Sequence, residues 1–189
     1  MAKKEIKNIA VFCGSSYGND PQIADDIKRL GYLLGTRGTH VFYGGGLYGN
    51  LQDFMEEVGK SGGTMDAVLP PAYFKPDEIY PDHVNVIPVK SDEERIRHFL
   101  QAEAFIITPG GDGTTAEAFF AHNQNLSALF QKQTQKPMVF MNTNGFYKHL
   151  RGHFNHLVEQ GYSNNDRQAR LYFEKAPVNV INRIVKTLK

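Results

Sequence analysis

The amino-acid sequence predicts an α/β protein built on a doubly wound, mainly parallel sheet of about six or seven strands. Short β-rich runs alternate along the chain with stretches of helical spacing, which is the order of a parallel sheet with crossover helices. Most of the runs are continuously apolar, as is typical of strands covered on both faces. These observations favour a single Rossmann-like domain over residues 1–189.

The strands are predicted from runs rich in β-branched and aromatic residues. They cover residues 9–13, 40–43, 65–69, 84–89, 104–108 and 137–142, with a shorter seventh run at 171–173. The longest irregular piece, residues 70–82 with its four prolines, is predicted to be a loop at the rim of the sheet.

The helices are predicted from capping residues and from apolar spacing. Asp20 followed by Pro21 indicates an N-cap and a first-turn proline, opening a helix that runs to about residue 37. Ser91 with Glu94 three positions later resembles a capping box before another helix. A further helix is predicted from apolar residues at positions i, i+3, i+4 and i+7, namely Leu51, Phe54, Met55 and Val58. Three more are expected over residues 114–131, 146–160 and 178–188.

Composition argues against several classes of function. The 189 residues are 41% hydrophobic and 22% charged, which is enough apolar content for a folded core. A net charge of +1 gives no strong field for nucleic acid or an anionic membrane, and no apolar run approaches the roughly 20 residues that span a bilayer. A single cysteine cannot form an internal disulfide, so we expect a cytoplasmic protein.

Three glycine-rich turns follow predicted strands, at the edge where parallel α/β sheets bind ligands. Glycine lets the backbone approach a ligand closely, and the free amides of a helix N-terminus favour a phosphate. One such turn has a structural explanation, but three at one edge predict a nucleotide or anion site. Its candidate residues are Gly14, Ser15, Ser16, Gly44, Gly45, Gly46, Gly49, Gly110, Gly111, Gly113, Thr114 and Thr115.

Two common nucleotide motifs are absent from these turns. Residues 14–18 do not fit the Gly-x-Gly-x-x-Gly pattern of dinucleotide binding, and no glycine run is followed by Gly-Lys-Ser/Thr. Dinucleotide redox chemistry and magnesium-dependent phosphoryl transfer are therefore disfavoured.

Two of the turns resemble the paired motifs of the Lonely Guy (LOG) family. Residues 109–117 fit the pattern Pro-Gly-Gly-x-Gly-Thr-x-x-Glu, and residues 44–49 fit the upstream Gly-Gly-Gly-x-x-Gly. The resemblance extends from about residue 8 to residue 165. It implies a cytokinin riboside 5′-monophosphate phosphoribohydrolase, which cleaves the purine base from AMP or an N6-modified AMP and leaves ribose 5-phosphate. It also implies a homodimer, with no metal and no other cofactor.

Residue by residue, the resemblance assigns roles in this sequence. Glu117 matches the catalytic glutamate of the motif, and Gly113-Thr114 and residues 44–46 match its phosphate-binding backbone. A carboxylate placed beside the sugar can stabilise an oxocarbenium-like state and take a proton from the attacking water. On its own, Glu117 would also be explained as a first-turn acid that complements the helix dipole.

The sequence departs from the family pattern at three places. The family arginine falls on Glu94 without a gap, so either Arg95 or Arg97 replaces it from a shifted register, or the activity is lost. Asn50 stands where the family has leucine. Asp112, at the variable position of the second motif, puts a carboxylate where it would repel a bound phosphate.

Other polar and aromatic residues have simpler explanations. His149, His153 and His156 could share a helix face, but packing of their apolar neighbours explains that helix better than a metal does. Cys13, at a strand end, is expected to be a small buried residue. Several aromatic residues near the loops could stack on a base or belong to the core or a dimer contact, namely Tyr17, Tyr43, Tyr48 and Phe74.

Two alternative functions stay open at this point. The same loops could hold a nucleotide or another phosphorylated metabolite without hydrolysis, and an arginine reaching the pocket opposite Glu117 would discriminate between the two. A pyridoxal-dependent decarboxylase would need a Schiff-base lysine, and none of the glycine turns contains one.

Overall fold

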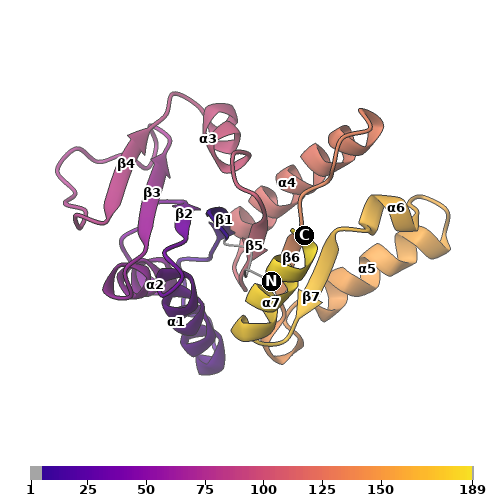
Figure 1. Ribbon diagram of the computed structural model, residues 1–189, viewed down its shortest axis with the longest axis horizontal. Helices are drawn as coiled ribbons and strands as arrows, with labels where there is room; N and C mark the ends of the chain where they lie inside the picture. The colour runs from indigo at the N-terminus through magenta and orange to yellow at the C-terminus, as the bar shows by residue number, and fades with distance from the viewer. Residues whose placement is uncertain (1–5, 189) are drawn as a thin grey trace, which may run out of the picture.

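The computed structural model describes residues 6–188, in which all paired strands form one parallel sheet with the order β4-β3-β2-β1-β5-β6-β7 (Figure 1). Residues 1–5 and 189 of the predicted domain lie outside the described part. The strands are β1 Asn8–Phe12, β2 His40–Tyr43, β3 Thr64–Leu69, β4 Val84–Pro88, β5 Phe105–Ile107, β6 Met138–Met141 and β7 Leu171–Glu174. The predicted parallel sheet is confirmed, and the seventh run pairs in parallel with β6.

Helices cover both faces of this sheet, as the doubly wound prediction requires. They are α1 Pro21–Gly35, α2 Gly49–Lys60, α3 Asp92–Phe99, α4 Asp112–Phe130, α5 Lys148–Glu159, α6 Asn165–Gln168 and α7 Pro177–Thr187, with a 3-10 turn η1 at Thr143–Gly145. One core forms under α1, α2 and α7, and a second lies on the opposite face under α3 and α4. No helix within residues 6–188 is long and apolar enough to cross a membrane.

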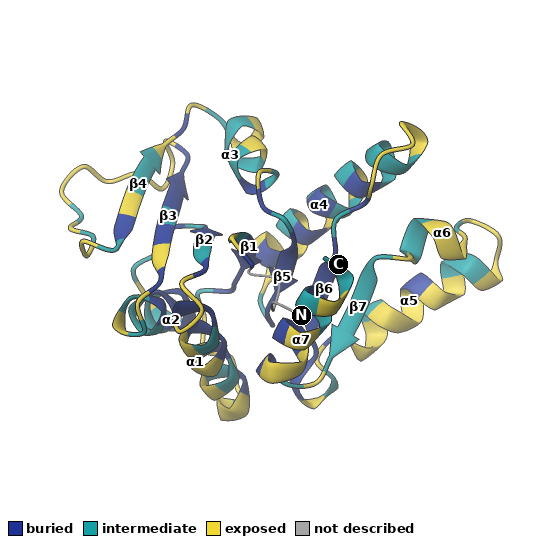
Figure 2. Cartoon of the chain, in the orientation of Figure 1, coloured by how far each residue is buried: buried dark blue, intermediate teal, exposed yellow. Residues whose placement is uncertain are grey.

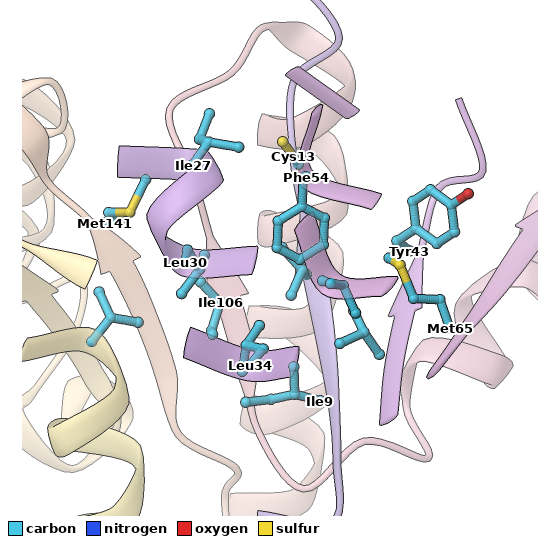
Figure 3. Close-up of a cluster of buried hydrophobic side chains, with 14 of the residues drawn as sticks. Ile9, Cys13, Ile27, Leu30, Leu34, Tyr43, Phe54, Met65, Ile106 and Met141 are labelled. Atoms are coloured by element: carbon cyan, nitrogen blue, oxygen red, sulfur yellow. The ribbon is translucent and has the colours of Figure 1, made fainter. Parts of the chain in front are cut away.

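The larger core explains why the strands are continuously apolar. Ile27, Leu30 and Leu34 of α1 are fully or almost fully buried, and Figure 3 shows them on the side of the helix that faces the strands, near Ile9 and Ile106. Figure 2 shows the central strands as mostly buried, whereas β4 and β7 at the two edges are more exposed. The sheet is therefore a rigid platform on which the loops at its carboxyl edge are built.

Two predicted N-caps are confirmed in detail, whereas α4, α5 and α7 begin one or two residues away from their predicted starts. The Asp20 side chain accepts a hydrogen bond from the Gln22 amide at 3.0 Å. The Ser91 hydroxyl accepts one from the Glu94 amide at 3.2 Å, so Glu94 belongs to the cap of α3. The first helix ends at Gly35, two residues earlier than expected, because the chain passes into a turn in which the Gly38 amide donates to Gly35 O at 2.8 Å. The short helix α6 and the turn η1 were not predicted.

Candidate active site

A cleft of about 550 Å³ lies at the carboxyl ends of the strands. Its walls come from the β1–α1, β2–α2 and β5–α4 turns, from the 70–82 loop between β3 and β4, from α3 and from Phe146. All three predicted glycine turns therefore meet in one cavity, at the edge where parallel sheets bind their ligands.

The three turns are packed backbone against backbone, which explains their glycines. A Cβ on Gly49 would stand 1.8 Å from the Ser15 carbonyl oxygen, and Gly49 has a φ of 56°. A Cβ on Gly14 would lie 2.7 Å from Gly110 Cα. Asn50 adds two hydrogen bonds, from its amide to Ser15 O at 3.1 Å and from Nδ2 to Ser16 O at 2.8 Å. Side chains at these glycines would push the turns apart.

Of the three helices that follow the glycine turns, two lack a side-chain cap. Asp20 caps α1, whereas the N-cap residues of α2 and α4, Tyr48 and Gly111, make no side-chain hydrogen bond to their helices. The Asn50 amide of α2 is already bonded to Ser15 O, so α4 offers the more open set of amides. The start of α4 therefore suits an anionic group, which unpaired amides and the helix dipole stabilise.

One ion pair crosses the cleft. Arg95 of α3 places Nη2 3.0 Å from Oε1 of Glu117 on α4, and both side chains are largely buried. Nε of Arg95 donates to Val68 O at 3.1 Å and Nη2 approaches Gly44 O at 3.5 Å. The guanidinium is thus anchored on the ends of β3 and β2 while it faces the glutamate.

The same surroundings change the acidity of the glutamate. Burial raises the pKa of the Glu117 carboxyl to about 7; the Arg95 guanidinium lowers it in part and the Asp92 carboxylate raises it. A carboxyl with a pKa near neutrality can gain and lose a proton at working pH, as a general base must.

Most of the predicted site residues line the cleft. These are Gly14, Ser15, Ser16, Gly44, Gly45, Gly46, Arg95, Gly110, Gly111, Gly113, Thr114 and Glu117. Gly49 lies behind the wall against Ser15, and the Thr115 hydroxyl donates to Gly111 O at 3.0 Å within its own helix. Arg97 is exposed on α3 and is not part of the lining, so of the two arginines Arg95 faces Glu117.

Of the other residues singled out from the sequence, some line the cleft and the rest lie in the core or on the outer surface. Tyr17 and Tyr48 line the cleft and are exposed, whereas Tyr43 is fully buried in the core and Phe74 is not part of the lining. Cys13 is buried at the base of the cleft, as expected, and burial raises the pKa of its thiol to about 12. The three histidines of α5 are exposed; they are His149, His153 and His156.

Sequence reasoning missed several lining residues. Tyr73, Lys75 and Glu78 reach the cleft from the 70–82 loop, and Phe146 reaches it from the turn after β6. The 70–82 loop has no periodic pattern, so the sequence marked only its Phe74, which does not line the cleft. Phe146 could have been found, because it follows a predicted strand at the same sheet edge.

Comparison with known proteins places the chain in a family. The family model described as "Possible lysine decarboxylase" matches residues 51–184. A cytokinin riboside 5′-monophosphate phosphoribohydrolase of Arabidopsis thaliana, LOG2, is 31% identical over 162 residues, covering 85% of this chain and 74% of the relative. A probable cytokinin riboside 5′-monophosphate phosphoribohydrolase of Oryza sativa subsp. japonica, LOGL1, is 31% identical over 160 residues, covering 84% of this chain and 70% of the relative.

Solved structures share the fold. The molybdenum cofactor binding protein of Rippkaea orientalis superposes with a TM-score of 0.69 at 19% identity, over 97% of this chain and 98% of the other. The molybdenum cofactor carrier protein of Chlamydomonas reinhardtii gives 0.67 at 22% identity, over 96% and 97%. The structural likeness extends over nearly the whole chain, and the sequence match shows that this chain belongs to the LOG family, the family described as possible lysine decarboxylases.

Proposed function

We propose that the chain is a phosphoribohydrolase that cleaves the N-glycosidic bond of AMP or an N6-modified AMP. The observation that carries this proposal is the Arg95–Glu117 pair at 3.0 Å, in the wall of a cleft that also contains the open N-terminus of α4. An arginine opposite the glutamate favours a hydrolase over a protein that only holds a nucleotide, because it can hold ribose or phosphate oxygens beside the general base. The relatives named as phosphoribohydrolases support the same reaction.

The 5′-phosphate binds at the start of α4, where no side chain caps the helix and the first-turn amides, among them those of Gly113 and Thr114, have no partner within the helix. The ribose then lies beside Glu117, about one turn further along the helix. Glu117 takes a proton from a water whose oxygen attacks C1′, while the bond from C1′ to the base nitrogen breaks and the base leaves with a proton from solvent. Free donors on Arg95 Nη1 hold ribose or phosphate oxygens.

A second candidate is a protein that binds a phosphorylated metabolite without cleaving it. The observation that favours it is Asp112, whose carboxylate lines the cleft in the first turn of α4, beside the proposed phosphate position. A negative charge there weakens the grip on a phosphate dianion. The solved structures with this fold include proteins named as binding or carrying a molybdenum cofactor.

We infer further that two copies of the chain associate. Support comes from α4, which exposes Phe119 by 43% and Phe130 by 72%. Large apolar side chains that share an exposed helix face can mark a protein contact. We expect a dimer in sedimentation velocity, and Phe119→Asp should shift it towards the monomer. A wild-type monomer at micromolar concentration would contradict this inference.

The hydrolase is tested by incubating the protein with AMP and with an N6-substituted AMP. Free base and ribose 5-phosphate should appear in equal amounts by chromatography, and adenosine, which lacks the phosphate, should stay intact. Glu117→Gln is the negative control, and Glu93→Gln, an exposed carboxylate on α3, is the matched control that should keep full activity. AMP that binds without release of adenine supports the second candidate.

A further inference from the structure

The cleft has charged side chains at two separate places. Arg95, Asp112 and Glu117 lie around the start of α4 and belong to the proposed reaction. Lys75 and Glu78 line the cleft from the 70–82 loop and have no role in that reaction. They form an ion pair with 3.0 Å between Nζ and Oε1, in which Glu78 is the less exposed partner. A charged pair of this kind in a cleft wall can recognise polar groups on a ligand.

The sheet topology fixes which part of a nucleotide would reach this pair. The strands run in the order β3-β2-β1-β5, so α4 begins at one end of the cleft and the 70–82 loop follows β3 at the other. Arg95 touches Val68 O and Gly44 O, at the ends of β3 and β2, and faces Glu117 between these two ends. A nucleotide with its phosphate at α4 and its ribose beside Glu117 therefore extends its base towards the 70–82 loop.

Backbone contacts hold this loop in a defined shape. The amides of Tyr73 and Phe74 both donate to Pro70 O, at 2.9 and 3.1 Å, and the Glu78 amide donates to Lys75 O at 3.1 Å. The Tyr80 hydroxyl donates to Gly45 O at 2.6 Å, which ties the far end of the loop to the β2–α2 turn. Because these contacts order the loop before a ligand arrives, its side chains can discriminate between ligands at little entropic cost.

We propose that Tyr73 and the Lys75–Glu78 pair form the base-recognition element of the cleft. Tyr73, a residue that is 61% exposed, offers an aromatic face on which the base stacks. The Glu78 carboxylate accepts a hydrogen bond from the 6-amino group of an adenine, and the Lys75 ammonium donates to a ring nitrogen. A 6-oxo purine would place a second acceptor against Glu78, so the element selects 6-aminopurines. This inference rests on the proposed function for the orientation of the ligand.

The test compares AMP and GMP, which differ only in the base, with ribose 5-phosphate, which has no base. Their affinities are measured by calorimetry in proteins that all carry Glu117→Gln, so that the nucleotides are not consumed. In this background, Glu78→Gln should lower the affinity for AMP roughly tenfold and abolish the preference for AMP over GMP. Tyr73→Ala should lower the affinity for both nucleotides roughly tenfold. Ribose 5-phosphate should bind equally well to all of these proteins.

Two neighbours in the same loop provide matched controls. Asp77→Asn removes an exposed carboxylate and Phe74→Ala an aromatic ring, and neither residue lines the cleft. Both should bind AMP as the parent does. Base recognition by this loop is overturned if Glu78→Gln and Tyr73→Ala leave AMP affinity unchanged, or if they weaken ribose 5-phosphate by the same factor.

The outcome is separable from that of the proposed hydrolysis. Wild-type protein that shows this binding pattern without releasing adenine refutes the hydrolase and keeps the base-recognition element. Wild-type protein that hydrolyses AMP, with Glu78→Gln and Tyr73→Ala unchanged in kcat/KM for AMP and GMP, keeps the hydrolase and refutes the element. Wild-type protein that binds neither AMP nor ribose 5-phosphate overturns both.

Discussion

Nη2 of Arg95 and Oε1 of Glu117 lie 3.0 Å apart, although the two side chains come from helices on either side of β5 in the chain. Val68 O and Gly44 O hold the guanidinium on the edge of the sheet, so the pair does not depend on flexible loops. In the proposed reaction, the Arg95 guanidinium holds the Glu117 carboxylate in position and balances its charge. A bound substrate then displaces this ion pair.

Replacing the glutamate by its neutral isostere should remove the chemistry and keep the ligand. Glu117→Gln is expected to lower kcat for AMP by roughly 10²–10⁴-fold, the usual contribution of a general base. AMP affinity, measured by calorimetry, should change little because the phosphate contacts at α4 are intact. A variant with near wild-type kcat would show that another group is the base.

The pH dependence of the reaction should report the acidity of Glu117. Because the base acts in its deprotonated form, kcat/KM of the wild type should rise with pH through about 7 and then level off. Arg95→Met removes the positive charge that lowers this pKa, so the rising limb should move to higher pH, whereas Arg95→Lys should move it less. A limb near pH 4.5 in the wild type would contradict the raised pKa of Glu117.

The same shift affects stability, with a definite sign. The folded-state pKa of Glu117, about 7, lies above the ordinary value of 4.5, so the folded chain binds more protons than the unfolded chain between these values. This group therefore lowers the free energy of unfolding as pH rises through that window. Glu117→Gln should gain Tm relative to wild type between pH 5 and pH 8, as calorimetry can measure. A Tm difference that stays constant over this range argues against the shift.

The close contact between the β1–α1 and β2–α2 turns should make the protein sensitive to any side chain at Gly49. Gly49→Ala would place a Cβ 1.8 Å from Ser15 O at a φ of 56°. It is expected to cost more than about 1 kcal/mol in denaturant unfolding and to raise KM, because the β1–α1 turn must move. Gly152→Ala in α5 meets nothing within 4 Å and should instead stabilise the protein by about 0.5–1 kcal/mol. Equal effects of the two changes would refute the contact.

Local pattern was enough to predict the sheet and most of its helices. Runs such as residues 9–13 and 104–108 are apolar because strands in the middle of a parallel sheet are covered on both faces. The cap residues Asp20 and Ser91 predicted helix starts because their side chains bond to neighbouring amides. The four-residue helix α6 escaped because so short a segment has no measurable period.

The candidate site was predictable only in part, for a physical reason. Arg95 and Arg97 are about 200° apart around a helix axis, so only one of them can face the sheet. The sequence alone could not tell which arginine it is. The helix α3 has only eight residues, of which one is buried, so its apolar pattern is too weak to show which side faces the sheet. The structure decides it through carbonyl contacts with strands distant in sequence. The lining from the 70–82 loop escaped for a related reason, since its shape depends on contacts such as that of Tyr80 with Gly45.

The cap of α1 has a consequence for which cofactors this fold can accept. One carboxylate oxygen of Asp20 accepts from the Gln22 amide at 3.0 Å, and the other from Asn144 Nδ2 at 2.9 Å, while Pro21 contributes no amide at all. In dinucleotide-binding relatives of this architecture, the corresponding helix start cradles a pyrophosphate. Here an internal anion already occupies that position. NAD or FAD bound in that manner would meet negative charge there, so the geometry agrees better with the single nucleotide unit of the proposed function.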